Sequence, residues 1–473
     1  MSPELTRILH AQRDAFLRDG IPSLKTRVDR IDRCIGLIVD HKDELCDAVN
    51  NDFGCRSHHV TQLNDIFPSI ATLKFVKKNL KYWMRPERRK SPFPMGLLGA
   101  RSEIHYQPKG VVGIMSPWNV PVNVVFSPLA DVFGAGNRAM IKPSEFNPNT
   151  VELLQKLFGE YFDETEVAIC AGGADVGAAF SALPLDHIIF TGSGGVGKLV
   201  MQAAAKNLTP VTLELGGKSP VIVSRSADIA EAAEKIMTIK AMNAGQVCIS
   251  PDYCFVPKTA LDAFISDCQK TVSEQYPTIG DNNDFVSMIN ESNFDRVKSF
   301  IDDAAAKGAR LITLNPSGES WDDRERHKIP LHLIIDPDDD MKVMQEELFG
   351  PVLCIKPYDT IDECINTINR RPRPLALYYL GKDKAEQQLV IDGTIAGGMC
   401  INDLAMHFAC DDMPFGGVGA SGMGHYHGRE GFKTFSHAKA VFRQGPVNLP
   451  KLSGTLPPYG EKVDKMMSRM IRR

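Results

Sequence analysis

A glycine-rich turn at residues 191–198 is the feature that most constrains how this chain can fold. A strand-like run, residues 186–190, comes immediately before the turn, and a helical run, residues 199–205, follows it. Glycines at 192, 194 and 197 satisfy the G-x-G-x-x-G spacing in this strand–turn–helix context. Free backbone N–H groups at the start of such a helix can hold a pyrophosphate. The turn therefore predicts an α/β unit that binds a dinucleotide.

The same turn nearly matches the P-loop of nucleoside triphosphatases, because Gly197 is followed by Lys198. Leu199 stands where that motif needs a serine or threonine for Mg²⁺. We therefore reject the P-loop interpretation and keep the dinucleotide one.

Two strand-like runs before the turn end in polar residues. The first, residues 111–115, leads to Asn119 in a loop stiffened by two prolines. An amide there can donate to a developing oxyanion, although capping the next helix is the commoner role of asparagine. The second, residues 139–141, leads to Lys142 and Glu145, which suit a phosphate or a ribose diol and equally suit a solvated surface.

A further strand-like run, residues 211–215, carries Glu214 and is followed by Gly216 and Gly217. Paired glycines let the backbone approach another group closely. Glu214 lies at about the distance from the glycine-rich turn that the dinucleotide fingerprint requires of its ribose-binding acid. It is equally suited to act as a catalytic base, and the pattern leaves both roles open.

One thiol, Cys248, lies in a stretch of small and polar residues, 243–250. A helical pattern over residues 229–239 precedes it, and Gly245 is the predicted helix end. Cys248 would then lie on a loop that a substrate can approach. The alternative is that it packs as a small hydrophobe, like others among the 11 cysteines.

Length and composition narrow the class of protein. The 473 residues suggest two or three domains, and the formal net charge of −4 gives no reason to expect nucleic acid or an acidic membrane as partner. The first 20 residues do not resemble a signal peptide, and no run of about 18 apolar residues predicts a membrane helix. Scattered cysteines in odd number favour a reduced, cytoplasmic protein. Without a CxxC pair or an HExxH motif, no metal site is expected.

Six stretches, taken together and in this order, resemble the NAD(P)-dependent aldehyde dehydrogenase family over roughly residues 20–440. The short N-terminus and the run at residues 425–432 resemble its class 3 branch. The six stretches are Pro117-Trp118-Asn119, Lys142-Pro143-Ser144-Glu145, Phe190-Thr191-Gly192-Ser193, Glu214-Leu215-Gly216-Gly217-Lys218, Gly245-Gln246-Val247-Cys248 and Glu347-Leu348-Phe349-Gly350-Pro351.

The resemblance implies a role for each matched residue. Cys248 would be the nucleophile, Glu214 the general base, and the Asn119 amide an oxyanion donor together with the Cys248 backbone N–H. The cofactor contacts that it implies are Trp118, Lys142, Ser144, Glu145, Gly192, Ser193, Gly197, Leu215, Glu347 and Phe349.

The resemblance also implies the reaction: oxidation of an aldehyde to the carboxylic acid through a cysteine thiohemiacetal and thioester. NAD is the expected cofactor, and NADP stays open. Substrates would be aromatic aldehydes such as coniferyl aldehyde, or medium-chain aliphatic ones. Val247 and Ile249 would flank the thiol, and Leu404, His407 and Phe408 would line the entrance.

Two rival functions remain. A coenzyme A-acylating member of the family usually lacks the glutamate that stands here at 214. A cysteine hydrolase or acyltransferase without nicotinamide needs a histidine partner for Cys248, and no recognisable motif supplies one.

The expected fold is α/β, with a Rossmann-type cofactor domain at residues 1–211 and an α/β catalytic domain carrying the thiol at 212–398. Residues 399–473 would return to the cofactor domain and end in a tail. By resemblance, a small β arm near 85–107, completed by the stretch around Val441, would bridge the subunits of a homodimer.

Overall fold

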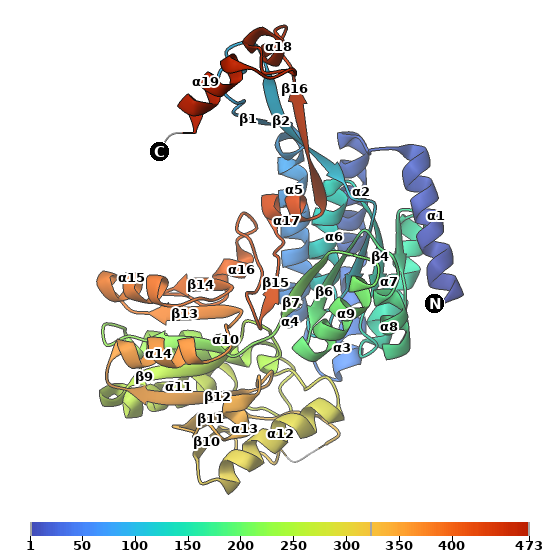
Figure 1. The fold of residues 1–473 in the computed structure, drawn as a ribbon. Coiled ribbons are helices and arrows are strands. Elements are labelled where there is room, and N and C mark those ends of the chain that lie inside the picture. Colours follow the sequence, from blue (N-terminus) through green and yellow to red (C-terminus); the bar gives the residue numbers. More distant parts are fainter. Residues whose placement is uncertain (1, 322–323, 472–473) are drawn as a thin grey trace.

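The computed structural model describes residues 2–321 and 324–471, which form two α/β lobes and a projecting arm (Figure 1). Each lobe is built around its own sheet, and the arm has a third, small sheet. The apolar core is continuous from the helices of the first lobe to the sheet of the second.

The sheet of the first lobe has six strands in the order β15-β7-β6-β3-β4-β5. Five run parallel, and the short β15 runs antiparallel to β7. Every residue of β3 and β4 is buried, as expected for strands that helices cover on both faces. The strands are β3 (Val111–Met115), β4 (Arg138–Lys142), β5 (Val167–Ile169), β6 (His187–Gly192), β7 (Val211–Leu215) and β15 (Gly422–Met423).

Helices from both ends of the chain surround this sheet. The N-terminal part of the chain is helical, and a π-helical turn, η1, interrupts one of its helical runs. The helices are α1 (Pro3–Asp19), α2 (Leu24–Asp40), α3 (Lys42–Phe53), α4 (His58–Thr61), η1 (Gln62–Ile66), α5 (Phe67–Trp83), α6 (Asn123–Ala135), α7 (Pro148–Tyr161), α8 (Ala174–Ser181), α9 (Gly194–Ala205) and α17 (Gly428–Thr434).

The sheet of the second lobe has seven strands, parallel except for β10 at one edge. In sheet order they are β10 (Arg310–Leu314), β11 (Leu331–Ile335), β12 (Val352–Tyr358), β9 (Pro251–Pro257), β8 (Ser219–Val223), β13 (Ala376–Leu380) and β14 (Gly398–Ile401). The helical segments are α10 (Ile229–Ala241), η2 (Met242–Gly245), η3 (Lys258–Ala260), α11 (Leu261–Gln275), α12 (Glu291–Ala306), α13 (Lys342–Gln345), α14 (Ile361–Arg370), α15 (Lys384–Gly393) and α16 (Met406–Ala409).

The arm leaves the first lobe and carries the C-terminal helices at its tip (Figure 1). It contains β1 (Glu87–Arg89), β2 (Arg101–Pro108), β16 (Ser436–Arg443), α18 (Leu449–Ser453) and α19 (Glu461–Met470). Val441 pairs with Glu103, so the two stretches predicted to form the arm lie in one antiparallel sheet. Although β2 and β3 are consecutive in sequence, they belong to different sheets.

These sheets confirm the predicted α/β class. The chain passes from the first sheet to the second after Leu215 and leaves the second after Ile401; the division into domains at residues 212 and 399 stays a prediction. Among the described residues, no helix is long and apolar enough to cross a membrane. Nor does any group of three or more potential metal ligands occur in that part of the chain.

Candidate active site

The candidate cofactor residues lie at the carboxyl ends of the strands in the first lobe. The chain builds this sheet outward from β3 through β4 to β5, then returns to the other side of β3 with β6 and β7. Open α/β sheets bind ligands where the strand order reverses in this way. Trp118 follows β3, Lys142 ends β4, Gly192 ends β6 and Leu215 ends β7, so the fold brings four predicted segments to one edge.

The glycine-rich turn forms the start of α9, as the spacing predicts. Ser193 is the N-cap, and its hydroxyl accepts a hydrogen bond from the Val196 N–H at 3.4 Å. A Cβ on Gly197 would lie 2.7 Å from the Leu215 side chain, so only glycine lets α9 pack this closely on β7. Gly194 has open space where a Cβ would be. The turn is therefore shaped to receive a pyrophosphate at the helix N-terminus.

Lys142 and Glu145 form an ion pair beside this turn, with Nζ and Oε2 2.8 Å apart. Lys142 is buried and Glu145 is exposed. Partial burial raises the pKa of Glu145, but the hydrogen bond from Lys142, the residue's own backbone N–H and the Lys142 charge together outweigh burial, so the net pKa is lowered. Ser144, also expected at the cofactor, accepts the Phe146 N–H at 3.2 Å and thus shapes the loop here.

The loop that precedes Cys248 has an unusual backbone. Asn243 and Ala244 both have φ of +52°, and Gly245 has φ of +72°. Three consecutive left-handed residues cannot continue an α-helix, so α10 ends at Ala241 rather than at Gly245 as the sequence pattern predicted. A Cβ on Gly245 would overlap the Gly350 carbonyl oxygen, which explains the glycine.

Gln246 fixes the shape of this loop through three hydrogen bonds of 3.0 Å. Its Nε2 donates to the carbonyls of Asn243 and Ser287, and its Oε1 accepts the Ile289 N–H. The sequence pattern gave no role to this buried amide. Cys248 follows two residues later and is partly exposed, so the loop presents its thiol as expected.

Asn119 joins the loop after β3 to the cysteine loop. Its Nδ2 donates to the Gln246 carbonyl at 3.0 Å, and the side chain is buried. The N-cap of α6 is Val122, so Asn119 does not take the helix-capping role that the sequence left open. One N–H of the amide is engaged, which leaves the second free to meet an oxyanion.

Glu214 is 2% exposed, and neither of its carboxylate oxygens has a hydrogen-bond partner among the described residues. It lies between two strands, opposite Thr191 of β6 and Gly422 of β15. Burial raises its pKa well above the usual value. A buried carboxyl without partners destabilises a fold, so its presence indicates a functional position.

The thiol of Cys248 is also shifted toward its protonated form. Although part of the residue is exposed, the protein packed around the sulfur, and then the charges of Glu347 and Glu214, raise its pKa to about 12, against smaller lowering by its own backbone N–H and that of Ile249. Burial raises the pKa of Glu347 to about 7, partly offset by the Gly217 N–H. Three titratable groups with raised pKa values therefore meet at the junction of the lobes.

Glu347 and Phe349 lie on a loop held by Arg296. The guanidinium donates to the carbonyls of Glu347 and Phe349 at 3.3 and 3.1 Å. The Phe349 ring meets Trp118 edge to face, with centroids 5.4 Å apart. Arg296 lies in a helical pattern outside every motif, so the sequence did not indicate that it would hold this loop.

The expected entrance residues are placed differently from the prediction. Leu404 and His407 are 1% and 6% exposed, and only Phe408 is partly exposed. The Nδ1 atom of His407 lies 3.1 Å from the Cys400 sulfur, which keeps the ring in the interior. The prediction that Leu404 and His407 lie at an open entrance is therefore wrong.

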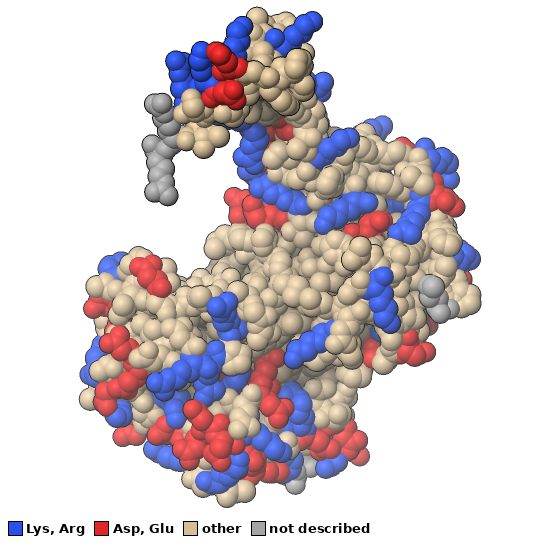
Figure 2. All heavy atoms as spheres, viewed as in Figure 1, with Lys and Arg blue, Asp and Glu red and all other residues tan. Residues whose placement is uncertain are grey.

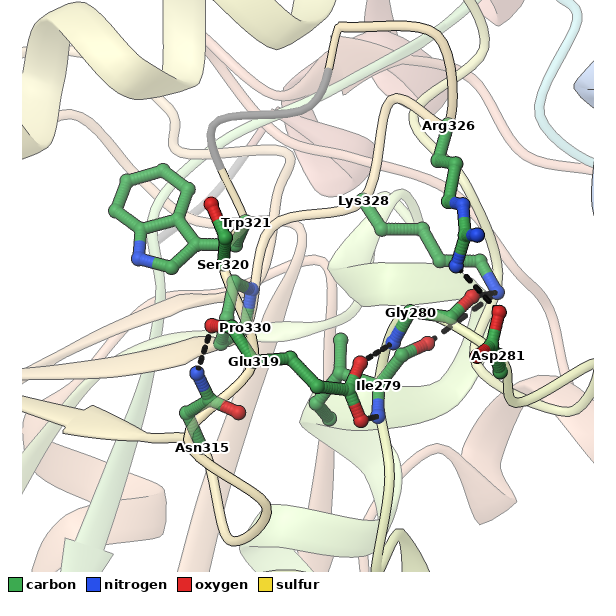
Figure 3. Close-up of a pocket in the computed structure, with 10 residues that line it drawn as sticks. All are labelled: Ile279, Gly280, Asp281, Asn315, Glu319, Ser320, Trp321, Arg326, Lys328 and Pro330. Atoms are coloured by element: carbon green, nitrogen blue, oxygen red, sulfur yellow. Dashed lines mark hydrogen bonds and ion pairs between the residues drawn. The ribbon is translucent and has the colours of Figure 1, made fainter.

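A cavity of about 290 Å³ lies elsewhere in the second lobe, between the loops near residues 280, 319 and 328 (Figure 3). Glu319 accepts the backbone N–H groups of Ile279 and Gly280, and Lys328 donates to the Gly280 carbonyl at 3.0 Å. In Figure 3 these polar groups point at one another and form hydrogen bonds with one another. None of the predicted site residues lines this cavity, so it is not the candidate active site.

Comparisons with known proteins show which family this chain is similar to. The model of the aldehyde dehydrogenase family matches residues 4–441. A Caulobacter vibrioides protein named probable coniferyl aldehyde dehydrogenase is 52% identical, over 98% of this chain and 96% of its own length. The coniferyl aldehyde dehydrogenase of Pseudomonas sp. strain HR199 is 47% identical, over 99% and 96%. Aldehyde dehydrogenase family 3 member A2 of Pongo abelii is 36% identical, over 92% and 89%.

Solved structures show the same fold. The substrate-bound state of Staphylococcus aureus AldH superimposes with a TM-score of 0.91 at 34% identity, covering 98% of this chain and 99% of its own. The Mycobacterium tuberculosis aldehyde dehydrogenase complexed with NAD+ gives a TM-score of 0.84 at 27% identity, covering 94% and 91%. The predicted resemblance, including that to class 3, is confirmed, and the chain belongs to the aldehyde dehydrogenase family.

Proposed function

We propose that this enzyme oxidises aromatic aldehydes to carboxylic acids with NAD+, with Cys248 as nucleophile, Glu214 as general base and Asn119 as oxyanion donor. The observation that carries the proposal is the unpartnered Glu214 carboxyl, buried close enough to Cys248 for its charge to raise the pKa of the thiol. A carboxyl with no structural partner beside a nucleophile is suited to accept a proton.

The first lobe fits a dinucleotide on three observations. The start of α9 has open space at Gly194, the Lys142–Glu145 pair lies after β4, two strands from β6 in the sheet, and Phe349 meets Trp118 beside the cysteine loop. We assign the pyrophosphate to the α9 turn, the adenosine ribose to Lys142 and Glu145, and the nicotinamide end to Glu347 and Phe349. When bound there, the nicotinamide supplies the hydride acceptor.

The chain's own residues supply the remaining chemistry. An aldehyde has no leaving group, so the Cys248 thiol releases its proton to solvent water, adds to the carbonyl carbon and forms a thiohemiacetal oxyanion. The free N–H of the Asn119 amide and the Cys248 backbone N–H stabilise that charge. The C–H bond then breaks with its electron pair, leaving a thioester on Cys248. Glu214 removes a proton from water, whose oxygen attacks the thioester, releasing the acid and restoring the thiol.

The aromatic substrate is supported by the relatives named for coniferyl aldehyde and by the side chains around the base. Tyr426 is buried, and its pKa is raised first by burial and then by the charges of Glu214 and Cys248, so its ring lies near both. The Phe415 and Phe408 rings pack edge to face beside it, with centroids 4.9 Å apart. Of these three rings only Phe408 is partly exposed and can contact a planar aldehyde, while medium-chain aliphatic aldehydes can also enter an apolar site.

We also propose NAD+ rather than NADP+. The pKa of Glu145 is lowered, so its carboxylate is charged at neutral pH, and it is exposed at the end of β4. A carboxylate can accept from a ribose 2′-hydroxyl, whereas it repels a 2′-phosphate.

No histidine nitrogen among the described residues is hydrogen-bonded to the Cys248 sulfur, which disfavours a cysteine hydrolase that acts without nicotinamide. The Glu214 carboxyl likewise disfavours transfer to coenzyme A, because a positioned base directs the thioester toward water.

The test is a rapid-mixing experiment with coniferyl aldehyde and NAD+. Glu214→Gln should produce one NADH per site in a burst and then turn over slowly, because acylation survives and hydrolysis does not. The matched control is Glu386→Gln, a second-lobe carboxyl bonded to Ser224 and Tyr379, which should keep wild-type turnover. Full steady-state activity in Glu214→Gln would refute the assignment of the base.

A further inference from the structure

A buried ion pair lies between the N-terminal helices and the loop that carries Asn119. Arg56, between α3 and α4, donates from Nη2 to Asp65 Oδ2 at 2.6 Å, and both side chains are 0% exposed. The Phe53 ring packs 4.9 Å from the guanidinium carbon. A buried pair of this kind is seldom more stable than apolar residues of the same volume, so its contacts need another explanation.

The remaining atoms of the pair bind the two ends of one loop. Arg56 Nη1 donates to the Asn119 carbonyl at 3.0 Å. Asp65 Oδ1 accepts the backbone N–H groups of Val122 and Asn123 at 3.0 and 3.1 Å. Each ion thus uses one atom for its partner and another for the segment from Asn119 to the start of α6.

Asn119 is thereby held at its backbone as well as at its side chain. Its carbonyl accepts from Arg56 and also from Asn243 Nδ2 at 2.9 Å, while its own amide donates to the Gln246 carbonyl. With these bonds made, the amide plane is fixed, and so is the direction of its second N–H. A catalytic donor is effective only when its orientation is set before the reaction.

The local helix geometry brings Asp65 to this place. The helical run from His58 to Trp83 contains the π-helical turn η1, which includes Asp65. One extra residue in a turn rotates the following register by about 100°. Such π turns are rare and occur frequently at functional sites.

We propose that Arg56 and Asp65 are positioning residues for the oxyanion donor, acting through the Asn119 backbone and touching neither substrate nor cofactor. The proposal rests on the role of Asn119 proposed above. It predicts that the pair affects the chemical step and that the effect disappears when the Asn119 amide is absent.

The test is a double-mutant cycle between Arg56→Lys and Asn119→Ala, read as the NADH burst rate with coniferyl aldehyde and NAD+. Lysine keeps a positive charge near Asp65, but it lacks the forked donors needed to reach the Asn119 carbonyl at the same time. Asn119→Ala should slow the burst by about 10²–10³, as loss of one oxyanion donor does. Arg56→Lys should slow it about tenfold in the wild-type background and by less than about twofold in Asn119→Ala, since coupled residues are non-additive. NAD+ affinity should not change.

Arg30→Lys is the matched control. Arg30 is also buried, bonds Glu166 at 2.9 Å and donates to a backbone carbonyl, that of Asn137, at 3.2 Å, but it contacts neither active-site loop. It should lower stability and leave the burst rate at the wild-type value. If Arg56→Lys does not fold, as judged by circular dichroism, Asp65→Asn replaces it in the cycle.

The outcomes distinguish failure of the positioning role from failure of the proposed function. Equal slowing by Arg56→Lys in both backgrounds, or no slowing in either, overturns the positioning role and leaves the proposed function intact. A wild-type burst rate in Asn119→Ala removes the oxyanion assignment itself, and the positioning role with it.

Discussion

Two groups of buried ionisable side chains in this enzyme differ in whether they have partners. Arg56 and Asp65 satisfy each other and three backbone groups of the neighbouring loop. Glu214 has no hydrogen-bond partner among the described residues, and the Cys248 pKa is raised first by burial and then by two nearby carboxylates. The paired group holds backbone in place, whereas the unpaired group keeps its proton-binding capacity for chemistry. Burying Glu214 without a partner thus lowers the stability of the fold, whereas the Arg56–Asp65 pair holds the loop of Asn119 in place.

The largest expected effect is that of removing the sulfur. Cys248→Ala should lower turnover by about 10⁴ or more, because no other group can hold the substrate covalently, and it should not reduce the free energy of unfolding. The matched control is Cys268→Ala on α11, a fully buried core cysteine, which should lose stability and keep activity. Steady-state assays measure the activity of the two variants, and urea unfolding measures their stability. A stability loss in Cys248→Ala equal to that in Cys268→Ala would show that Cys248 is a structural core residue like the control.

Breaking the paired group should cost stability instead. Asp65→Ala leaves the Arg56 guanidinium buried without its counter-ion, and such a change destabilises proteins by about 3–5 kcal/mol. The unfolding midpoint in urea measures this loss, with Asp43→Ala on the exposed face of α3 as the control. A loss no larger than in the control would show that the pair contributes no structural restraint.

The pH dependence of stability should also differ with and without Glu214. Its pKa is raised in the folded protein, so folding is penalised once pH exceeds the unfolded value of about 4.5 and the penalty grows up to the folded pKa. Glu214→Gln removes that penalty. The variant should match the wild type at pH 4.5 and become more stable above it, by at most about 1.4 kcal/mol per pH unit. Urea unfolding from pH 4.5 to 8 tests this, and parallel curves would contradict it.

The smallest effect is expected at the Lys142–Glu145 ion pair. Its lysine is buried and its glutamate is exposed, so in burial it lies between the Arg56–Asp65 pair and a surface pair. Glu145→Gln should raise kcat/KM with NADP+ relative to NAD+ by about five- to tenfold, because it removes one like charge near a 2′-phosphate. Its stability should change by less than about 1 kcal/mol, as is usual for exposed ion pairs. Unchanged cofactor preference would place the ribose elsewhere.

The sequence predicts the fold class and most of the candidate site residues, but not the contacts that hold those residues in place. The alternating strand and helix periods indicated the α/β class, and the ordered motifs indicated the family and the candidate residues. Local pattern could not indicate the left-handed backbone before Cys248, because Asn243 and Ala244 adopt φ of +52° only under tertiary restraint. Arg56 and Arg296 escaped notice for a related reason: each acts on backbone carbonyls more than 50 residues away. The burial of His407 depends on Cys400, and no periodicity encodes that contact.

The charged surface also differs between regions. Lys, Arg, Asp and Glu side chains cover much of the second lobe in the face drawn, while the hollow between that lobe and the arm is mostly uncharged (Figure 2).

The pairing of Gly422 with Glu214 has a consequence for synthesis on the ribosome. The strand that bears the base is made about two hundred residues before the short strand that covers it. Until residues 422 and 423 emerge, β7 lacks its antiparallel neighbour β15 and would be an edge strand. The nascent chain therefore carries Cys248 long before Glu214, the base proposed above, has β15 as its neighbouring strand.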